Sequence, residues 1–115
     1  MPATMKAMRV HETGGAFQLD EVPVPKPGPN DALLKLKATG VGLTPVLMRR
    51  TAGLIDKFPR IMGHEIAAEV VEIGSQVECV AVGDLVTAHS HDQSRSFVRY
   101  AKLGQRLGRE CGREV

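Results

Sequence analysis

The sequence predicts a mainly β domain that forms a partly open barrel with one or two short helices. Short segments with strand-like alternation of apolar and polar residues recur along the chain, separated by turn residues. Prolines alternate from Pro23 to Pro29, where they cannot supply ladder donors, so this stretch is expected to be an extended edge or a connector. A partly closed barrel is preferred to a flat sheet because closure removes exposed edges.

Length and composition limit the class of protein. A chain of 115 residues is long enough for one domain with a real core and short for two. Hydrophobic content of 43% and charged content of 24% are ordinary for a globular domain, and only 3% of residues are aromatic, so the core must be aliphatic. A formal net charge of +2 gives no reason to expect nucleic acid or a membrane surface as partner.

The cysteines and the hydropathy indicate a reducing compartment. Cys79 and Cys111 do not make a disulfide framework, and neither lies in a Cys-x-x-Cys pair. No stretch resembles a signal peptide or reaches the roughly 20 apolar residues of a membrane span. We therefore expect a cytoplasmic protein. Cys79, in an extended apolar run, is expected to be a small core residue, and Cys111 a surface thiol.

The first half of the chain predicts three strands. Residues 6–10 form the first, and residues 13–15 form a turn after it. Residues 17–22 alternate apolar and polar, so they are expected to pair back on the first strand. After the proline-rich connector, Asn30-Asp31 turns the chain into residues 32–38, which are expected to be a strand with one buried face.

One short helix is predicted after a glycine-containing loop. Thr44 is placed to cap it and Pro45 to occupy its first position, with residues 46–50 as its body and Gly53 at its end. Residues 54–60 are expected to be a loop.

The second half is organised around residues 59–74. Residues 66–73 are β-branched and bounded by glycines, which favours a strand over a helix, although Ala68 and Glu69 are compatible with either. Further on we expect an extended segment over 77–82, a turn at Gly83-Asp84, a strand over 85–88, a polar loop over 89–94 and a last strand over 97–103.

The last twelve residues differ from the rest. Residues 104–115 combine regularly spaced glycines with alternating charge and have too few apolar residues to bury, so we expect a frayed or disordered tail after a domain of residues 1–103. No strand-G-x-G-x-x-G-helix fingerprint and no P-loop occurs in the chain.

Several motifs occur in a familiar order: M-K-A-M-R-V at 5–10, L-D-E-V-P-V-P-K-P-G-P-N at 19–30, G-H-E-I-A-A-E-V-V-E-I-G at 63–74 and V-G-D-L-V at 82–86. In this order they resemble the N-terminal catalytic domain of the zinc-type alcohol dehydrogenases, in the medium-chain dehydrogenase/reductase superfamily. The resemblance covers about residues 5–103. It implies a GroES-like β-barrel and hydride transfer between an alcohol or carbonyl and NAD(P).

The resemblance also implies site residues. In the family a zinc ion polarises the substrate oxygen, held by a Cys in the loop after the third strand, by the His of G-H-E and by a later ligand. It makes His64 a metal ligand, Glu65 a neighbour that can approach the metal, and Thr44 the hydroxyl that relays the substrate proton. The family's loop pattern G-V-C-H-[ST]-D is here G-V-G-L-T-P, so Gly42 stands at the cysteine position. Catalytic zinc takes about three protein ligands, so weak zinc binding or none is expected.

Two further departures concern whole segments. Only H-S-H-D-Q-S-R-S, at 89–96, intervenes between the strand that includes the end of V-G-D-L-V and the last expected strand, so the four cysteines of a structural zinc lobe are missing. This shortening resembles the zinc-free quinone reductases, whereas the G-H-E motif resembles the zinc-type branch. The family's nucleotide-binding half is absent from these 115 residues. We therefore expect that this chain alone does not bind NAD(P) and that it is a truncated catalytic domain, inactive by itself. The alternative is a non-catalytic module that docks on a full-length relative. The expected partner is a second copy of the chain, giving a homo-oligomer, or a full-length dehydrogenase.

Each candidate residue also has an ordinary structural interpretation. His64 can be satisfied by a backbone partner, and Thr44 can be a helix cap instead of a proton relay; for Thr44 the cap is favoured. His89 and His91, one residue apart, can bind a metal, or both can be solvated, which is favoured.

Three charged residues are assigned ordinary roles. Asp84 is expected to serve the turn in which it lies. Arg49 and Arg50 are expected to form a solvated helix face, with substrate contact as the alternative.

Overall fold

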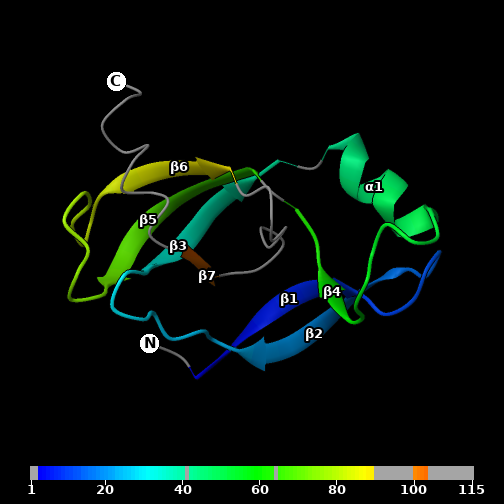
Figure 1. Ribbon diagram of the computed structural model, residues 1–115, viewed down its shortest axis with the longest axis horizontal. Helices are drawn as coiled ribbons and strands as arrows, with labels where there is room; N and C mark the ends of the chain where they lie inside the picture. The colour runs from blue at the N-terminus through cyan, green and yellow to red at the C-terminus, as the bar shows by residue number, and fades with distance from the viewer. Residues whose placement is uncertain (1–2, 41, 64, 90–99, 104–115) are drawn as a thin grey trace.

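The computed structural model describes residues 3–40, 42–63, 65–89 and 100–103, and within them it has two antiparallel sheets and one helix (Figure 1). The predicted mainly β fold with a partly open barrel is confirmed. The elements in chain order are β1 (Thr4–Val10), β2 (Phe17–Pro23), β3 (Ala32–Thr39), α1 (Leu43–Arg50), β4 (Arg60–Ile61), β5 (Glu65–Ile73), β6 (Leu85–His89) and β7 (Tyr100–Leu103).

The smaller sheet has the strand order β2-β1-β4. β1 and β2 form the predicted hairpin, in register from Thr4 opposite Pro23 to Val10 opposite Phe17. The two-residue strand β4 pairs with the end of β1 and was not predicted, because two residues are too few to produce a periodic pattern.

The larger sheet has the order β6-β5-β3-β7 and is built around β5. The alternation along β5 puts Ile66, Ala68 and Val70 in the interior and decides the question of helix or strand in favour of the strand. β3 pairs with β5 in an antiparallel register that shifts twice, between Leu33 and Leu34 and again beyond Leu36. These irregularities bend the strand and re-aim its far end toward the first residue of β5.

The proline-rich connector between β2 and β3 is fixed at its second half. The turn predicted at residues 30–31 is present, with the Asp31 carboxylate accepting from the Gly28 amide at 2.8 Å. The amide of Gly74 then donates to the Asp31 carbonyl at 2.8 Å, and the amide of Gln76 donates to the Pro29 carbonyl at 2.8 Å. The connector is therefore held against the turn that follows β5.

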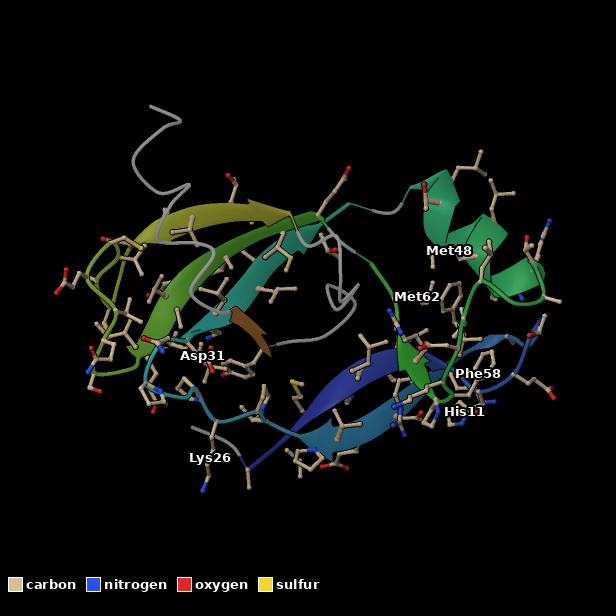
Figure 2. The ribbon with its side chains drawn as sticks, in the orientation of Figure 1. His11, Lys26, Asp31, Met48, Phe58 and Met62 are labelled. Atoms are coloured by element: carbon tan, nitrogen blue, oxygen red, sulfur yellow. The ribbon has the colours of Figure 1, made fainter. Side chains whose placement is uncertain are left out.

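The core is aliphatic, as the composition requires. Its largest fully buried side chains are Leu33, Leu34, Met62, Val10 and Val70. Figure 2 shows Met48 of α1 and Met62 in the region between the helix and the smaller sheet, and Met48 packs against the buried group of Val10, Ile55 and Met62. This contact fixes the inner face of α1 onto the barrel.

The predicted N-cap of the helix is wrong. α1 begins two residues earlier than expected, with Gly42 as N-cap and no side-chain cap hydrogen bond, so Thr44 and Pro45 both lie inside the first turn. The first amides of a helix have no intrahelical partner, so proline is tolerated throughout that turn and does not define its start. At the other end, the amide of Thr51 donates to the Leu47 carbonyl at 3.1 Å, and Gly53 follows with φ of 83°.

Two other expectations are also corrected. Cys79 is exposed instead of buried; of residues 77–82, which have no regular secondary structure, only Val80 packs on the core. Arg49 is half-buried, and its guanidinium donates to the Gly15 carbonyl at 2.6 Å and lies 5.6 Å from the centroid of the Phe17 ring. Only Arg50 is a solvated side chain, as expected.

The turn predicted at Gly83-Asp84 is confirmed. Gly83 has φ of 97°, a value that favours glycine, and the Asp84 carboxylate accepts from the Ala81 amide at 2.9 Å. His64, His91, Cys111, the loop over 90–94 and the tail over 104–115 lie outside the described residues. In the described part of the chain, no helix is long and apolar enough to span a membrane.

Candidate functional site

The candidate site lies where the end of β3 meets the start of β5. The hydroxyl of Thr39 donates to the Glu65 carbonyl at 2.9 Å, and the amide of Gly40 donates to the same carbonyl at 3.3 Å. The segment that leads to Gly42 and α1 therefore leaves the sheet at a fixed point. That point is adjacent in sequence to His64, whose own placement is outside the described residues.

The side chain of Glu65 lies against the backbone of Gly40. A Cβ at residue 40 would overlap the carboxylate and lie 3.1 Å from Cδ and 3.2 Å from Cβ of Glu65. Glycine is the residue that leaves this space to the carboxylate. Glu65 itself is exposed, so its carboxylate lies at the surface of the junction.

A shallow hollow of about 400 Å³ opens beside this junction. Its volume is within the range of small-molecule sites, although it is open to solvent and not enclosed. Its lining includes the small residues Ala38, Gly40 and Ala67, which leave room beside Glu65. The residues that line it are Ala38, Thr39, Gly40, Glu65, Ile66, Ala67 and Thr87.

The loop position implied for a zinc thiolate has no donor. Gly42 is the exposed N-cap of α1, and a Cβ added there would meet nothing within 4 Å. The missing side chain is thus not required by crowding. Over residues 3–40, 42–63, 65–89 and 100–103 there is no group of three His, Cys, Asp or Glu that could hold a metal ion.

The other predicted site residues are distributed around the junction. Thr44 is exposed in the first turn of α1; its role as N-cap is wrong, and its role as proton relay stays a prediction. Glu65 is the first residue of β5, and in the register of β5 and β6 its partner is His89. The fold therefore brings positions 65 and 89 together at one end of the sheet, which the sequence did not reveal.

Among the described residues, a charge cluster lies at the β1–β2 hairpin, away from this site. The Asp20 carboxylate accepts from Arg9 Nε at 2.7 Å and is 2.6 Å from His11 Nε2. Hydrogen bonds from Arg9 and from His11 hold the pKa of Asp20 below its ordinary value of 3.8. This cluster stabilises the hairpin and has no contact with the hollow.

The open β-barrel and the short helix after its third strand define a GroES-like domain, and the junction at Gly40 and Glu65 is its candidate site. Residues 28–111 match the family described as alcohol dehydrogenase GroES-like domain. The chain belongs to this family.

Curated relatives are much longer than this chain. It is 43% identical over 94 residues to the L-threonine 3-dehydrogenase of Pyrococcus horikoshii, and the aligned segment covers 79% of this chain and 27% of that protein. It is 37% identical over 109 residues to the NAD-dependent alcohol dehydrogenase of Sulfurisphaera tokodaii, which covers 88% of this chain and 31% of the relative. The chain therefore spans between a quarter and a third of the length of these two relatives.

Solved structures have the same fold. An alcohol dehydrogenase superfamily protein from Novosphingobium aromaticivorans superposes with a TM-score of 0.82 at 28% identity, covering 90% of this chain and 33% of the other. The quinone oxidoreductase from Coxiella burnetii superposes with a TM-score of 0.80 at 25% identity, covering 88% and 35%. Both branches of the superfamily that the sequence resembles are thus structural neighbours, and the fold does not separate them.

Sequence reasoning missed Thr39, Gly40 and Thr87 as parts of the site. Gly40 had a weak signal, since a glycine directly after a strand can mark a close approach of another group. Thr39 and Thr87 had none, because their positions depend on the shifted register of β3 and on the pairing of β6 with β5.

Proposed function

We propose that this chain is the substrate-side domain of an NAD(P)-dependent oxidoreductase that interconverts an alcohol and a carbonyl compound. Membership of the alcohol dehydrogenase GroES-like family supports the reaction class. The hollow beside Glu65 is the proposed substrate end of the site, and Thr44 is the proposed proton relay. The 115 residues alone do not turn over substrate, since they contain no dinucleotide fingerprint to hold a nicotinamide.

A second proposal concerns zinc, and the observation that supports it is the absence of a side-chain donor at Gly42. A zinc ion in this family would supply Lewis-acid polarisation of the substrate oxygen, and it needs about three protein ligands. Gly42 supplies no donor, and the described residues offer no set of three. Among the described residues no donor set fits a catalytic zinc, so we propose a domain whose zinc function is lost or strongly weakened.

Turnover by the purified chain tests the first part. The chain is incubated with NAD⁺ or NADP⁺ and a panel of alcohols that includes L-threonine, and absorbance of the reduced nicotinamide is followed. No turnover above a heat-inactivated control is expected. Nicotinamide reduction that scales with chain concentration would contradict the proposal that the chain is inactive alone.

A chimera tests the second part. Residues 5–103 replace the matching segment of the Pyrococcus horikoshii relative, once with Gly42 and once with Gly42→Cys. We expect zinc-dependent turnover only in the Gly42→Cys chimera, because a Cβ at this position meets open space. Equal turnover of the two folded chimeras would refute the role assigned to residue 42, and no turnover of either would refute the oxidoreductase assignment.

A second function is docking onto a full-length relative without catalysis. The observation that favours it is the outer face of α1, where Leu43 is 69% and Leu47 51% exposed. These two leucines are four residues apart and so share one side of the helix. Pull-down of the purified relative by the wild-type chain, and its loss in Leu47→Lys, is expected if docking is the function; a stable, monodisperse monomer that captures nothing would exclude it.

A further inference from the structure

In the described part of the chain, β6 is an outer strand of the larger sheet. It pairs with β5 on one side, and over the described ranges no strand pairs with its other side. Its first residue, Leu85, is 78% exposed, and Val82 in the preceding turn is 61% exposed. An uncovered edge of this kind is a template for pairing with another strand.

The four edge strands of the described fold differ in protection. β2 carries Asp20, Glu21 and Pro23, β4 carries Arg60 and β7 carries Lys102, and charges or prolines on an edge oppose pairing with a second chain. β6, with the sequence L-V-T-A-H, has no Asp, Glu, Lys, Arg or Pro. Of these four edges, β6 is therefore the one along which two copies of the strand could pair without placing like charges opposite one another and without a proline that lacks the amide donor.

The backbone geometry shows which groups of β6 face outward. The amide of Val70 donates to the Asp84 carbonyl at 2.9 Å, so residue 84 is a hydrogen-bonded position opposite β5. In an antiparallel ladder such positions alternate. With Ala68 opposite Val86 and Ala67 opposite Thr87, Val86 is bonded to β5, whereas the amides and carbonyls of Leu85, Thr87 and His89 point to the open side.

These outward groups define one best pairing. We infer that β6 pairs antiparallel with β6 of a second copy of this chain, with the two-fold axis at Thr87. In that register the backbone of Thr87 exchanges two hydrogen bonds with Thr87 of the second copy. Leu85 of each copy exchanges two backbone hydrogen bonds with His89 of the other copy. Registers centred on Val86 or Ala88 lose one of these mutual pairs, so they are weaker.

The pairing has a consequence for the candidate site. Thr87 lines the hollow beside Glu65. A second β6 would continue the sheet past this residue and place Thr87 of the other copy next to it. The two hollows then adjoin across the two-fold axis, and the partner copy extends a site that is shallow in one chain. This inference does not depend on the reaction proposed above.

Charge swapping at residue 87 tests the pairing. Thr87→Lys and Thr87→Glu each put like charges directly opposite one another, and we expect dimerisation in sedimentation velocity to weaken by roughly fivefold or more. An equimolar mixture of the two variants should recover the dimer as a heterodimer. Gln18→Lys and Gln18→Glu, at an exposed position of β2, are the matched controls and should leave the dimer unchanged. Failure of the mixture to recover would overturn the inference.

Amide exchange of the wild-type chain gives a second test that needs no variant. As chain concentration rises, protection should increase at Leu85, Thr87 and His89 and stay constant at Val86 and Ala88. A wild-type chain that remains a monomer at high micromolar concentration, without added protection at the first three amides, contradicts the inference. So does a dimer that persists in Thr87→Lys and is lost in Leu47→Lys, since the contact would then be on α1.

Discussion

Two glycine-to-alanine substitutions make a matched test of the packing described above. At Gly74 an added Cβ would lie 2.5 Å from the Pro29 carbonyl carbon and closer still to the carbonyl oxygens of Gly28 and Pro29. These are backbone atoms and cannot rotate away, so the connector must separate from the turn. Overpacking costs about 1–3 kcal/mol, and weakening two hydrogen bonds costs about 0.5–1.5 kcal/mol each. Because these effects overlap, we expect Gly74→Ala to lower the free energy of unfolding by about 3 kcal/mol.

At Gly40 the three atoms nearest to the added methyl all belong to the side chain of Glu65. A carboxylate at the end of a flexible side chain can move, and alanine also reduces the entropy of the unfolded chain by about 0.4–1 kcal/mol. Gly40→Ala should therefore change the free energy of unfolding by less than about 1 kcal/mol. It moves the Glu65 carboxylate without unfolding the domain.

Urea denaturation followed by far-ultraviolet circular dichroism measures both variants. With a slope of about 1–3 kcal/mol per molar urea, the midpoint of Gly74→Ala should fall by roughly 1–3 M while that of Gly40→Ala stays near the wild type. Equal losses in the two variants would refute the distinction between backbone and side-chain crowding. A wild-type midpoint for Gly74→Ala would show that the connector is not held against the turn.

The remaining predictions concern three polar contacts. Arg49→Met should lower the free energy of unfolding by about 1–2 kcal/mol, because it removes the hydrogen bonds to the carbonyls of residues 14 and 15. The control Arg50→Met should lower it by less than about 0.5 kcal/mol. A larger loss of thermal stability in Arg50→Met than in Arg49→Met would refute the role of the Arg49 contact. Asp84→Ala should cost about 1 kcal/mol by removing the acceptor of the Ala81 amide, and an unchanged urea midpoint would argue against it. The lowered pKa of Asp20 means that its stabilisation is present above pH 3.8 and is lost as pH falls through the folded-state pKa. Asp20→Asn should therefore flatten the acid limb of a stability–pH curve below pH 3.8, and an identical acid limb would exclude the contribution.

The elements that have a clear local sequence pattern were predicted well. The alternation of β5, the β1–β2 hairpin and the turn at Asp84 are local patterns in which side-chain chemistry alone decides the conformation. The order of the motifs was also enough to identify the family, which the match over residues 28–111 confirms. Long elements with a strong period and short turns with a specific residue requirement are the features that a sequence specifies by itself.

Features that depend on partners distant in sequence were missed. Thr44 looked like a cap because its local sequence permits one, whereas the helix begins at Leu43 with Gly42 as its N-cap. Cys79 lies in an apolar run and yet is exposed, and Arg49 looked solvated although it reaches the β1–β2 turn. The contact of Glu65 with Gly40 depends on a register shift that no local pattern encodes. The candidate site was thus predicted by resemblance and not by periodicity.

Gly42 offers no side-chain donor at the position where the resemblance implies a zinc thiolate, and the zinc content of the chain tests the proposal that zinc binding is lost or weakened. The purified chain is dialysed against metal-free buffer and analysed for zinc beside Gly42→Cys and His64→Ala. We predict far less than one zinc per wild-type chain and a clear gain in Gly42→Cys, because the structure has open space for that side chain. Near-stoichiometric zinc in the wild type that is lost in His64→Ala would contradict this prediction, since the chain would then hold a catalytic-type metal without a donor at residue 42.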